Sequence, residues 1–262
     1  MIIKKFLKWY SPLAFDDGLD KLNKRATLLA ASKRVGKMLD IGCGDGVFTM
    51  EFAKKVKPKS IYGIEYVDET RKLATNKGIK CVKSDLNSEW DLESSKFDLI
   101  LSSQNIEHMH NTRLYLEECF RCLKPGGRLI ILTENLSSWV NVLSLALGWQ
   151  PFSTTCINGY NLGNPLTWHL GVKKDQDFLD KYQKSGVTGT VGHVRVLAYR
   201  GLYEMLEVTG FKKITLSSTG YLPFFGWLSD FFCKLDPRHG NFLMAYAIKP
   251  KNRVKTRRKK RN

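Results

Sequence analysis

The chain has 262 residues, of which 43% are hydrophobic and 26% charged, and its formal net charge is +17. This length suffices for one large α/β domain, and the apolar content is too high for a disordered chain. No apolar run reaches the ~18 residues of a membrane span, and the first ten residues lack the apolar core of a secretory signal, so we expect a cytoplasmic protein.

Six cysteines are scattered along the chain without the paired spacing of a disulfide framework, which fits a reducing compartment. Cys119 and Cys122 form a single C-x-x-C, but no second pair or histidine lies near them at ligand spacing. A zinc site needs four ligands. We therefore interpret the two cysteines as small apolar residues on one helix face, and we predict no metal site.

Strand and helix patterns alternate along the first half of the chain. Residues 1–36 form a helical lead-in, in which Leu22, Ala26 and Ala30 recur at helical spacing. The elements predicted after it are strands at 37–42, 60–66, 79–85, 96–103 and 128–135, and helices at 46–56, 68–78 and 112–127. Strands separated by helices indicate right-handed crossovers and a doubly wound parallel sheet.

The second half adds two more strands and a long insertion. A helix at 198–211 is followed by strands at 212–218 and 241–249, which are expected to pair antiparallel at one sheet edge. We therefore predict an α/β fold with a Rossmann-like, seven-stranded sheet whose last strand is antiparallel. Residues 135–198 show no regular period, and long irregular insertions usually carry function, so we interpret them as a substrate lid. The expected domains are the lead-in 1–36, the main domain 37–250 and a disordered basic tail 251–262.

Three glycines, Gly42, Gly44 and Gly46, lie within five residues between the first strand and its helix. Their spacing is one residue tighter than the G-x-G-x-x-G of dinucleotide-binding loops. Asp40 and Asp45 flank or enter the loop, where two carboxylates would repel a diphosphate but suit a cationic ligand. The pattern therefore predicts a positively charged ligand that approaches the main chain closely, at the carboxyl ends of the strands.

The loop, together with "FDLILSSQNIEH" at the fourth strand and "LKPGGRLIIL" before the fifth, resembles the class I S-adenosylmethionine-dependent methyltransferases. The resemblance is close over residues 36–134 and loose over 198–248. It implies S-adenosylmethionine as the cofactor and S-adenosylhomocysteine as the product. It further implies that Glu65 binds the ribose hydroxyls and Asp85 the adenine amino group. The cofactor-binding residues expected on this basis are Asp40, Gly42, Cys43, Gly44, Asp45, Gly46, Glu65, Tyr66, Asp85, Leu86 and Gln104.

Histidine is the natural general base for an oxygen acceptor, because its pKa lies near neutral pH. His108 follows the fourth strand at a position that faces the methyl group in the resembled family. His193 and Arg195 lie two residues apart in a strand-like part of the insertion, so both are expected to point inward. We predict His108 or His193 as the catalytic base, with Asn105, His169 and Arg195 binding the substrate. A structural role for each histidine stays open.

The segment after the fourth strand reads "SSQN" and lacks the Pro-Pro-aromatic motif of enzymes that methylate amines of bases or glutamine. We therefore predict methyl transfer to an oxygen of a small-molecule or lipid-linked acceptor, such as a glycan precursor. The aromatic connector 220–240 and the basic termini would suit peripheral contact with an anionic membrane. Two alternatives stay open: an RNA methyltransferase that binds nucleic acid through its tail, and a non-catalytic scaffold that binds the donor.

Overall fold

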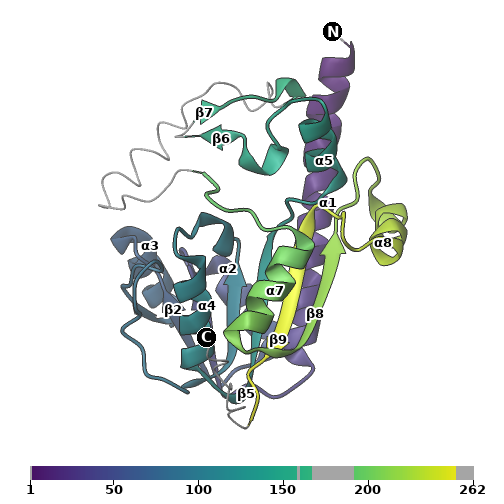
Figure 1. The fold of residues 1–262 in the computed structure, drawn as a ribbon. Helices are drawn as coiled ribbons and strands as arrows, with labels where there is room; N and C mark the ends of the chain where they lie inside the picture. Colours follow the sequence, from purple (N-terminus) through teal and green to yellow (C-terminus); the bar gives the residue numbers. More distant parts are fainter. Residues whose placement is uncertain (1, 158–159, 167–191, 252–262) are drawn as a thin grey trace, which may run out of the picture.

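The computed structural model of the chain describes residues 2–157, 160–166 and 192–251 (Figure 1). Within these ranges, seven strands form one sheet in the order β3-β2-β1-β4-β5-β9-β8. They are β1 (Lys37–Ile41), β2 (Ser60–Ile64), β3 (Lys80–Val82), β4 (Phe97–Ser103), β5 (Leu123–Glu134), β8 (Lys212–Thr219) and β9 (Phe242–Ile248). Neighbours among β1 to β5 pair in parallel, whereas β9 is antiparallel to both β5 and β8. The predicted fold class is confirmed.

Helices cover both faces of the sheet because its buried side chains alternate between them. Leu39 of β1 packs with residues of α4 and α7 on one face, and Met38 packs with residues of α1 and α2 on the other. The helices are α1 (Ile2–Ala31), α2 (Val47–Val56), α3 (Asp68–Asn76), α4 (Thr112–Cys122), α7 (Tyr199–Thr209) and α8 (Gly226–Leu235). Fully burying one such leucine stabilises the fold by about 1.5–3 kcal/mol. In the described ranges, no helix is both long and apolar enough to span a bilayer.

The predicted lead-in is the long helix α1, which Figure 1 shows in purple running along the sheet near β8 and β9. Leu22, Ala26 and Ala30 form its buried stripe, as their spacing predicts. The buried Arg128 of β5 donates to the carbonyls of Ala30 (3.0 Å) and Lys33 (3.1 Å). Carbonyls at the end of a helix have no partner within it, so this arginine both caps α1 and ties it to the sheet.

The lack of a regular period predicted for 135–198 is wrong for residues 139–146, which form helix α5 (Trp139–Ala146). The buried face of this helix is polar: it consists of Asn141 and Ser144, and Asn141 donates to the Asn135 carbonyl (2.9 Å). Its leucines face solvent instead, so a search for an apolar stripe could not find it. The shorter elements nearby are η2 (Phe152–Thr154), β6 (Cys156–Ile157) and β7 (Tyr160–Asn161).

Two further element ends differ from the prediction. Strand β3 ends at Val82 and not at Asp85, whose carboxylate accepts from the N–H of Asn87 (2.9 Å) in a local turn. Helix α4 ends at Cys122, before the Pro-Gly-Gly that was expected to stop it, because Leu123 is already extended and begins β5. Both changes leave the functional side chains at the carboxyl edge of the sheet.

Candidate active site

The glycine loop between β1 and α2 is built from three residues with left-handed backbone: Gly42, Gly44 and Gly46 have φ of 64°, 56° and 81°. A Cβ at Gly42 would lie 2.1 Å from Oδ1 of Asn105, and one at Gly46 would lie 2.6 Å from Cδ1 of Ile79. A Cβ at Gly44 would meet nothing within 4 Å. Two of the glycines therefore permit close internal packing, and the third leaves bare main chain beside open space.

Glu65 follows β2 and faces this loop. Its Oε2 accepts the N–H of Gly44 (2.9 Å) and its Oε1 accepts the N–H of Val67 (2.8 Å). A carboxylate oxygen can accept two hydrogen bonds, so each oxygen retains one acceptor position for a ligand. The carboxylate is thus oriented by the main chain and remains able to bind a pair of hydroxyl groups.

Asp40 and Asp45 brace the loop. Asp40 is buried in β1 and accepts a hydrogen bond from the hydroxyl of Thr49 in α2 at 2.5 Å. Burial raises the pKa of Asp40 to about 7, although the hydrogen bond from Thr49 acts in the opposite direction. Asp45 accepts the N–H of Val47 (3.0 Å) and so caps the first turn of α2. Cys43 also has a bracing role, because its thiol is buried and its N–H donates to the carbonyl of Ile64 (3.0 Å).

The residues after β3 line the next strand end. Asp85 is exposed, whereas Leu86 is partly buried against the main core. Tyr66, which follows Glu65, lies with its ring 5.2 Å from the ammonium of Lys83. Asp85 and Leu86 therefore follow the end of β3 by three and four residues, and their expected contact with the adenine stays a prediction.

Two polar residues follow β4 and lie beside the glycine loop. Gln104 has φ of 53°, and among the described residues its buried Nε2 has no hydrogen-bond partner. Asn105 donates through Nδ2 to the carbonyls of Ile41 and Ser103, each at 2.7 Å. Both hydrogens of the Asn105 amide are therefore used in hydrogen bonds at the start of the loop. Its expected contact with the substrate stays a prediction.

A second group of side chains forms where the insertion returns to the sheet. Glu107 and His108 lie on the short helix η1 (Ile106–His108), and His193 lies in the segment before α7. The N–H groups of Val194 and Arg195 both donate to the Glu107 carbonyl, at 2.8 and 2.9 Å. These two bonds bring His193 to η1, although 84 residues separate it from His108 in the sequence.

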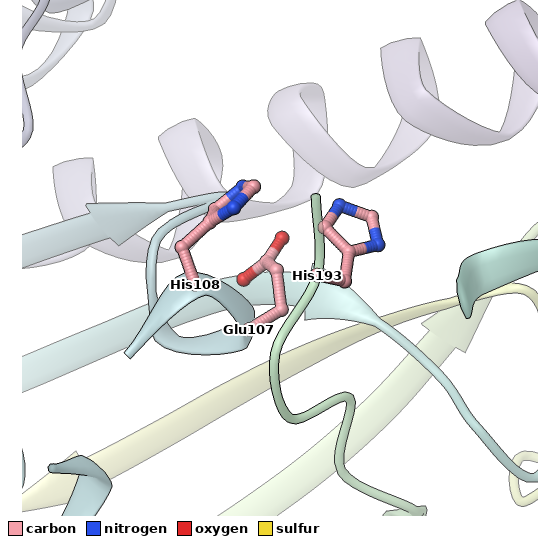
Figure 2. A group of neighbouring side chains, drawn as sticks. All are labelled: Glu107, His108 and His193. Carbon is pink, nitrogen blue, oxygen red and sulfur yellow. The ribbon is translucent and has the colours of Figure 1, made fainter. Parts of the chain in front are cut away.

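Figure 2 shows the carboxylate of Glu107 lying between the two imidazoles. The rings of His108 and His193 meet edge to face with centroids 4.9 Å apart. One ligand atom from each of the three residues lies within 4.8 Å of the others. Oε2 of Glu107 accepts the hydroxyl of Thr133 (2.9 Å), whereas its buried Oε1 has no partner among the described residues. We call Glu107, His108 and His193 the Glu-His-His cluster.

A family model described as "Methyltransferase domain" matches residues 16–216 of the chain. The chain belongs to the class I S-adenosylmethionine-dependent methyltransferases. The mitochondrial ubiquinone biosynthesis O-methyltransferase of Rattus norvegicus is 30% identical over 123 residues, which are 44% of this chain and 35% of that protein. The chain thus matches about a third of the length of this curated relative.

Solved structures share the fold. A S-adenosylmethionine-dependent methyltransferase from Mesorhizobium loti superposes with a TM-score of 0.54 at 19% identity, covering 88% of this chain and all of its own. The [4+2]-cyclase SpnF also has a TM-score of 0.54, at 16% identity, covering 87% of this chain and 81% of its own. Because a cyclase shares the fold, the reaction of this methyltransferase domain has to be argued from its site.

The donor end fits S-adenosylmethionine in three respects. Gly44 leaves bare main chain beside open space, where a methionyl group can approach. The Glu65 carboxylate has one acceptor position free on each oxygen, which suits a ribose diol. Gln104 lies at the end of β4, next to the loop, and its buried Nε2 has no hydrogen-bond partner among the described residues, so it can donate to a ligand. This methyltransferase domain would hold the donor with Gly44 and Glu65, with Asp85 and Leu86 at the adenine.

The acceptor end has unusual proton affinities. Burial raises the pKa of Glu107 to about 7 and that of Glu134 to about 8. Burial and the neighbouring His193 lower the pKa of His108 to about 4. An imidazole with so low a pKa is neutral at physiological pH but a weak general base, because a base works best when its pKa is near the working pH.

The side chains of the remaining predicted residues lie apart from the cluster or outside the described ranges. The main chain of Arg195 contacts Glu107, but its side chain is exposed and donates to the hydroxyl of Thr112 (3.4 Å), so the prediction that it points inward from a strand is wrong. His169 lies outside the described residues. Sequence reasoning missed Glu134, whose Oε2 lies 3.5 Å from Nδ1 of His193. The sequence did contain a signal for Glu134, because this acid lies at the end of the fifth strand just as Glu65 lies directly after the second.

Proposed function

We propose that this protein transfers the methyl group of S-adenosylmethionine to an oxygen of a small-molecule or lipid-linked acceptor. The observation that carries the proposal is the position of Asn105. Its amide holds Ile41 at the start of the glycine loop, and Glu107 follows it by two residues. The donor loop and the Glu-His-His cluster therefore lie at the carboxyl ends of the neighbouring strands β1 and β4, and in-line transfer requires donor and acceptor to lie close together in this way.

On the donor side, the chain fixes its ligand mainly through main chain and one carboxylate. Glu65, held by the N–H groups of Gly44 and Val67, would accept both ribose hydroxyls with charge-assisted hydrogen bonds. Asp85 would accept from the adenine amino group, with Leu86 against the ring. The bound donor supplies an electrophilic methyl group on a sulfonium.

On the acceptor side, the reaction forms one C–O bond and breaks one C–S bond, whose electron pair stays on sulfur. The acceptor hydroxyl loses its proton, so the site needs a group that removes this proton or acidifies the hydroxyl. The Glu-His-His cluster supplies the groups placed for this task, because Glu107 and His108 follow β4 directly. His108 and His193 remain the predicted catalytic residues.

The name of a curated relative supports an oxygen acceptor, because that protein is called a ubiquinone biosynthesis O-methyltransferase. The name does not mention a glycan. An oxygen of a small-molecule or lipid-linked acceptor therefore remains the proposal.

An apolar surface supports peripheral contact with the membrane from which such an acceptor would come. Phe225, Trp227 and Phe231 of the α8 region are 55%, 78% and 49% exposed. Trp139, at the start of α5, is 38% exposed and donates to Asp236 (3.1 Å) just beyond the end of α8. Aromatic side chains on a protein of net charge +17 suit an anionic lipid surface.

The function is tested by incubating the full chain with radiolabelled S-adenosylmethionine and the lipid, small-molecule, RNA and protein fractions of a cell extract. We expect label in an ether product of the lipid or small-molecule fraction. The variant Glu65→Ala should abolish the labelling, whereas Glu69→Ala, an exposed acid four residues later, should not. Label in RNA or protein only, or no label in any fraction, contradicts the proposal.

Membrane contact is tested separately by co-sedimentation with vesicles. We expect the protein to sediment with vesicles containing phosphatidylglycerol and not with pure phosphatidylcholine. Trp227→Ser should reduce the bound fraction severalfold. The matched control is Leu73→Ser, which changes a side chain 50% exposed on α3. If both variants sediment to the same extent as the unmodified chain, the α8 region does not bind the membrane.

The RNA alternative depends on the basic tail, of which residues 252–262 lie outside the described ranges. It predicts RNA binding that weakens steeply with salt and disappears when residues 251–262 are deleted.

A further inference from the structure

Glu107 has an oxygen whose burial calls for a partner. The residue is 0% exposed, and Oε1 finds no donor among the described residues, although Oε2 is satisfied by Thr133. Leaving a buried carboxylate oxygen unpaired is unfavourable, because the group has lost its hydrogen bonds to water without gaining another donor. Figure 2 shows this carboxylate lying between the imidazoles of His108 and His193.

Both imidazoles are oriented by a contact between Nδ1 and a main-chain carbonyl. Nδ1 of His108 lies 3.1 Å from the carbonyl of Gly192, and Nδ1 of His193 lies 2.6 Å from the carbonyl of Ser153. A carbonyl only accepts, so each Nδ1 carries the hydrogen and each Nε2 has a free lone pair. Histidines that bind metals are held in this way, with one ring N–H donated to a carbonyl and the other nitrogen free to coordinate.

We propose that Glu107, His108 and His193 bind a divalent first-row transition cation. Each of the three residues offers one ligand atom, and all three atoms lie within 4.8 Å of one another. A metal with bonds of about 2.0–2.2 Å holds its ligand atoms about 3–4 Å apart, so modest side-chain rotations would complete the site. The cation would also satisfy the unpaired Oε1 of Glu107.

The donor set selects the class of cation. Two neutral imidazoles and one carboxylate suit Zn²⁺, Fe²⁺, Co²⁺ or Mn²⁺, whereas Mg²⁺ and Ca²⁺ prefer oxygen ligands. Three protein ligands leave at least one coordination position open, which is the pattern of a catalytic site. The prediction of no metal site concerned Cys119 and Cys122, which are buried in α4. It did not include His108 and His193, which the sequence suggests only as general bases.

The role of the cation rests on the proposed function, whereas its binding does not. At the open position it would take the acceptor oxygen and act as a Lewis acid, which favours loss of the hydroxyl proton to solvent before the C–O bond forms. His108 and His193 would then be ligands and not general bases. Acceptors with two neighbouring oxygen atoms would be preferred, because both can reach one cation.

Binding is tested on the full chain after treatment with chelator and dialysis. We expect calorimetry to show one equivalent of Zn²⁺, and Co²⁺ to give the ligand-field absorption of a site with nitrogen ligands, with Mg²⁺ much weaker. Glu107→Gln keeps an acceptor for Thr133 but removes the charge and Oε1, and it should weaken Zn²⁺ binding at least tenfold. His193→Gln should do the same. His110→Gln, an exposed histidine outside the cluster, is the control and should bind like the unmodified chain.

The variants are checked for folding by circular dichroism and for an intact donor end by calorimetry with S-adenosylhomocysteine. Equal Zn²⁺ affinity of Glu107→Gln, His193→Gln and the unmodified chain overturns the proposal, and so does the absence of Zn²⁺ and Co²⁺ binding. If methyl transfer to oxygen occurs but is indifferent to chelator, the proposed function stands and the catalytic role of the cation falls. If Zn²⁺ binds in a Glu107-dependent way but no fraction is methylated, the metal site stands and the proposed function falls.

Discussion

The two ends of the candidate active site are constructed differently. The donor end is assembled from one short loop and the residues that follow β2 and β3, and its contacts are largely main-chain hydrogen bonds such as that from Gly44 to Glu65. The acceptor end joins η1 to a segment 84 residues away. There Glu107 is buried with a raised pKa, and His108 is partly buried with a lowered pKa. Asn105 lies between the two ends and is hydrogen-bonded to the loop.

The difference shows which parts of such a site tolerate sequence change. A site built from main chain needs glycine at fixed positions but leaves its neighbours free. A site built from buried charged and polar side chains depends on every partner, because each unpaired group there costs free energy. The following predictions test this contrast, beginning with the largest expected effect.

Substituting the loop glycines should separate stability from binding. Gly42→Ala places Cβ against Asn105 in addition to straining a positive φ, so we expect it to lower the free energy of unfolding by about 2–4 kcal/mol. Gly44→Ala has the strain without the contact and should cost about 1–2 kcal/mol, yet its Cβ would occupy the donor's place. Denaturant unfolding and calorimetry with S-adenosylhomocysteine measure the two effects. Equal losses of stability would refute the packing argument.

Glu65→Ala should weaken binding of S-adenosylhomocysteine by well over tenfold. The reason is the loss of two charge-assisted hydrogen bonds to the ribose and of the acceptor that orients Gly44. Calorimetry measures the affinity, with Glu69→Ala as the exposed control on α3. An unchanged affinity would show that Glu65 does not hold the ribose.

Asp40→Asn should change how stability depends on pH. Burial raises the pKa of Asp40 from its ordinary 3.8 to about 7, so folding favours the protonated form. The stability that this group contributes is complete below its ordinary pKa and is lost as the pH rises through about 7, by up to about 1.4 kcal/mol per pH unit. Asparagine still accepts from Thr49 but does not ionise, so the variant should gain on the unmodified chain between about pH 5 and pH 7. The free energies of unfolding of the variant and of the unmodified chain are measured at both pH values. If they differ by the same amount at each pH, the Asp40 carboxylate is less buried than its raised pKa implies.

The smallest expected effect tests the independence of the two ends. His108→Gln alters the Glu-His-His cluster but none of the described contacts of Glu65 or the glycine loop. We therefore expect its affinity for S-adenosylhomocysteine to stay within about twofold of the unmodified chain, because well-separated sites without shared partners behave additively. A loss as large as that of Glu65→Ala would mean that the two ends are coupled through the η1 segment.

Local sequence patterns were sufficient to predict the doubly wound sheet, the glycine loop and the acids near the strand ends. These features are local: a period of two or 3.6 residues, and glycines at positions that need left-handed backbone, can be read within a few residues. Asn105 shows the limit, because one of the two carbonyls that its amide contacts, that of Ile41, lies 64 residues away in the sequence.

The arrangement of the acceptor end could not be predicted before the fold was known. The sequence placed His108 and His193 among five histidines without showing that Glu107 lies between them, that Glu134 lies near His193, or that α5 buries a polar face. Those relations depend on hydrogen bonds between distant segments, such as those from Val194 and Arg195 to Glu107, which leave no periodic trace in the chain. Burial then sets the charge of each group, and burial is a property of the folded whole.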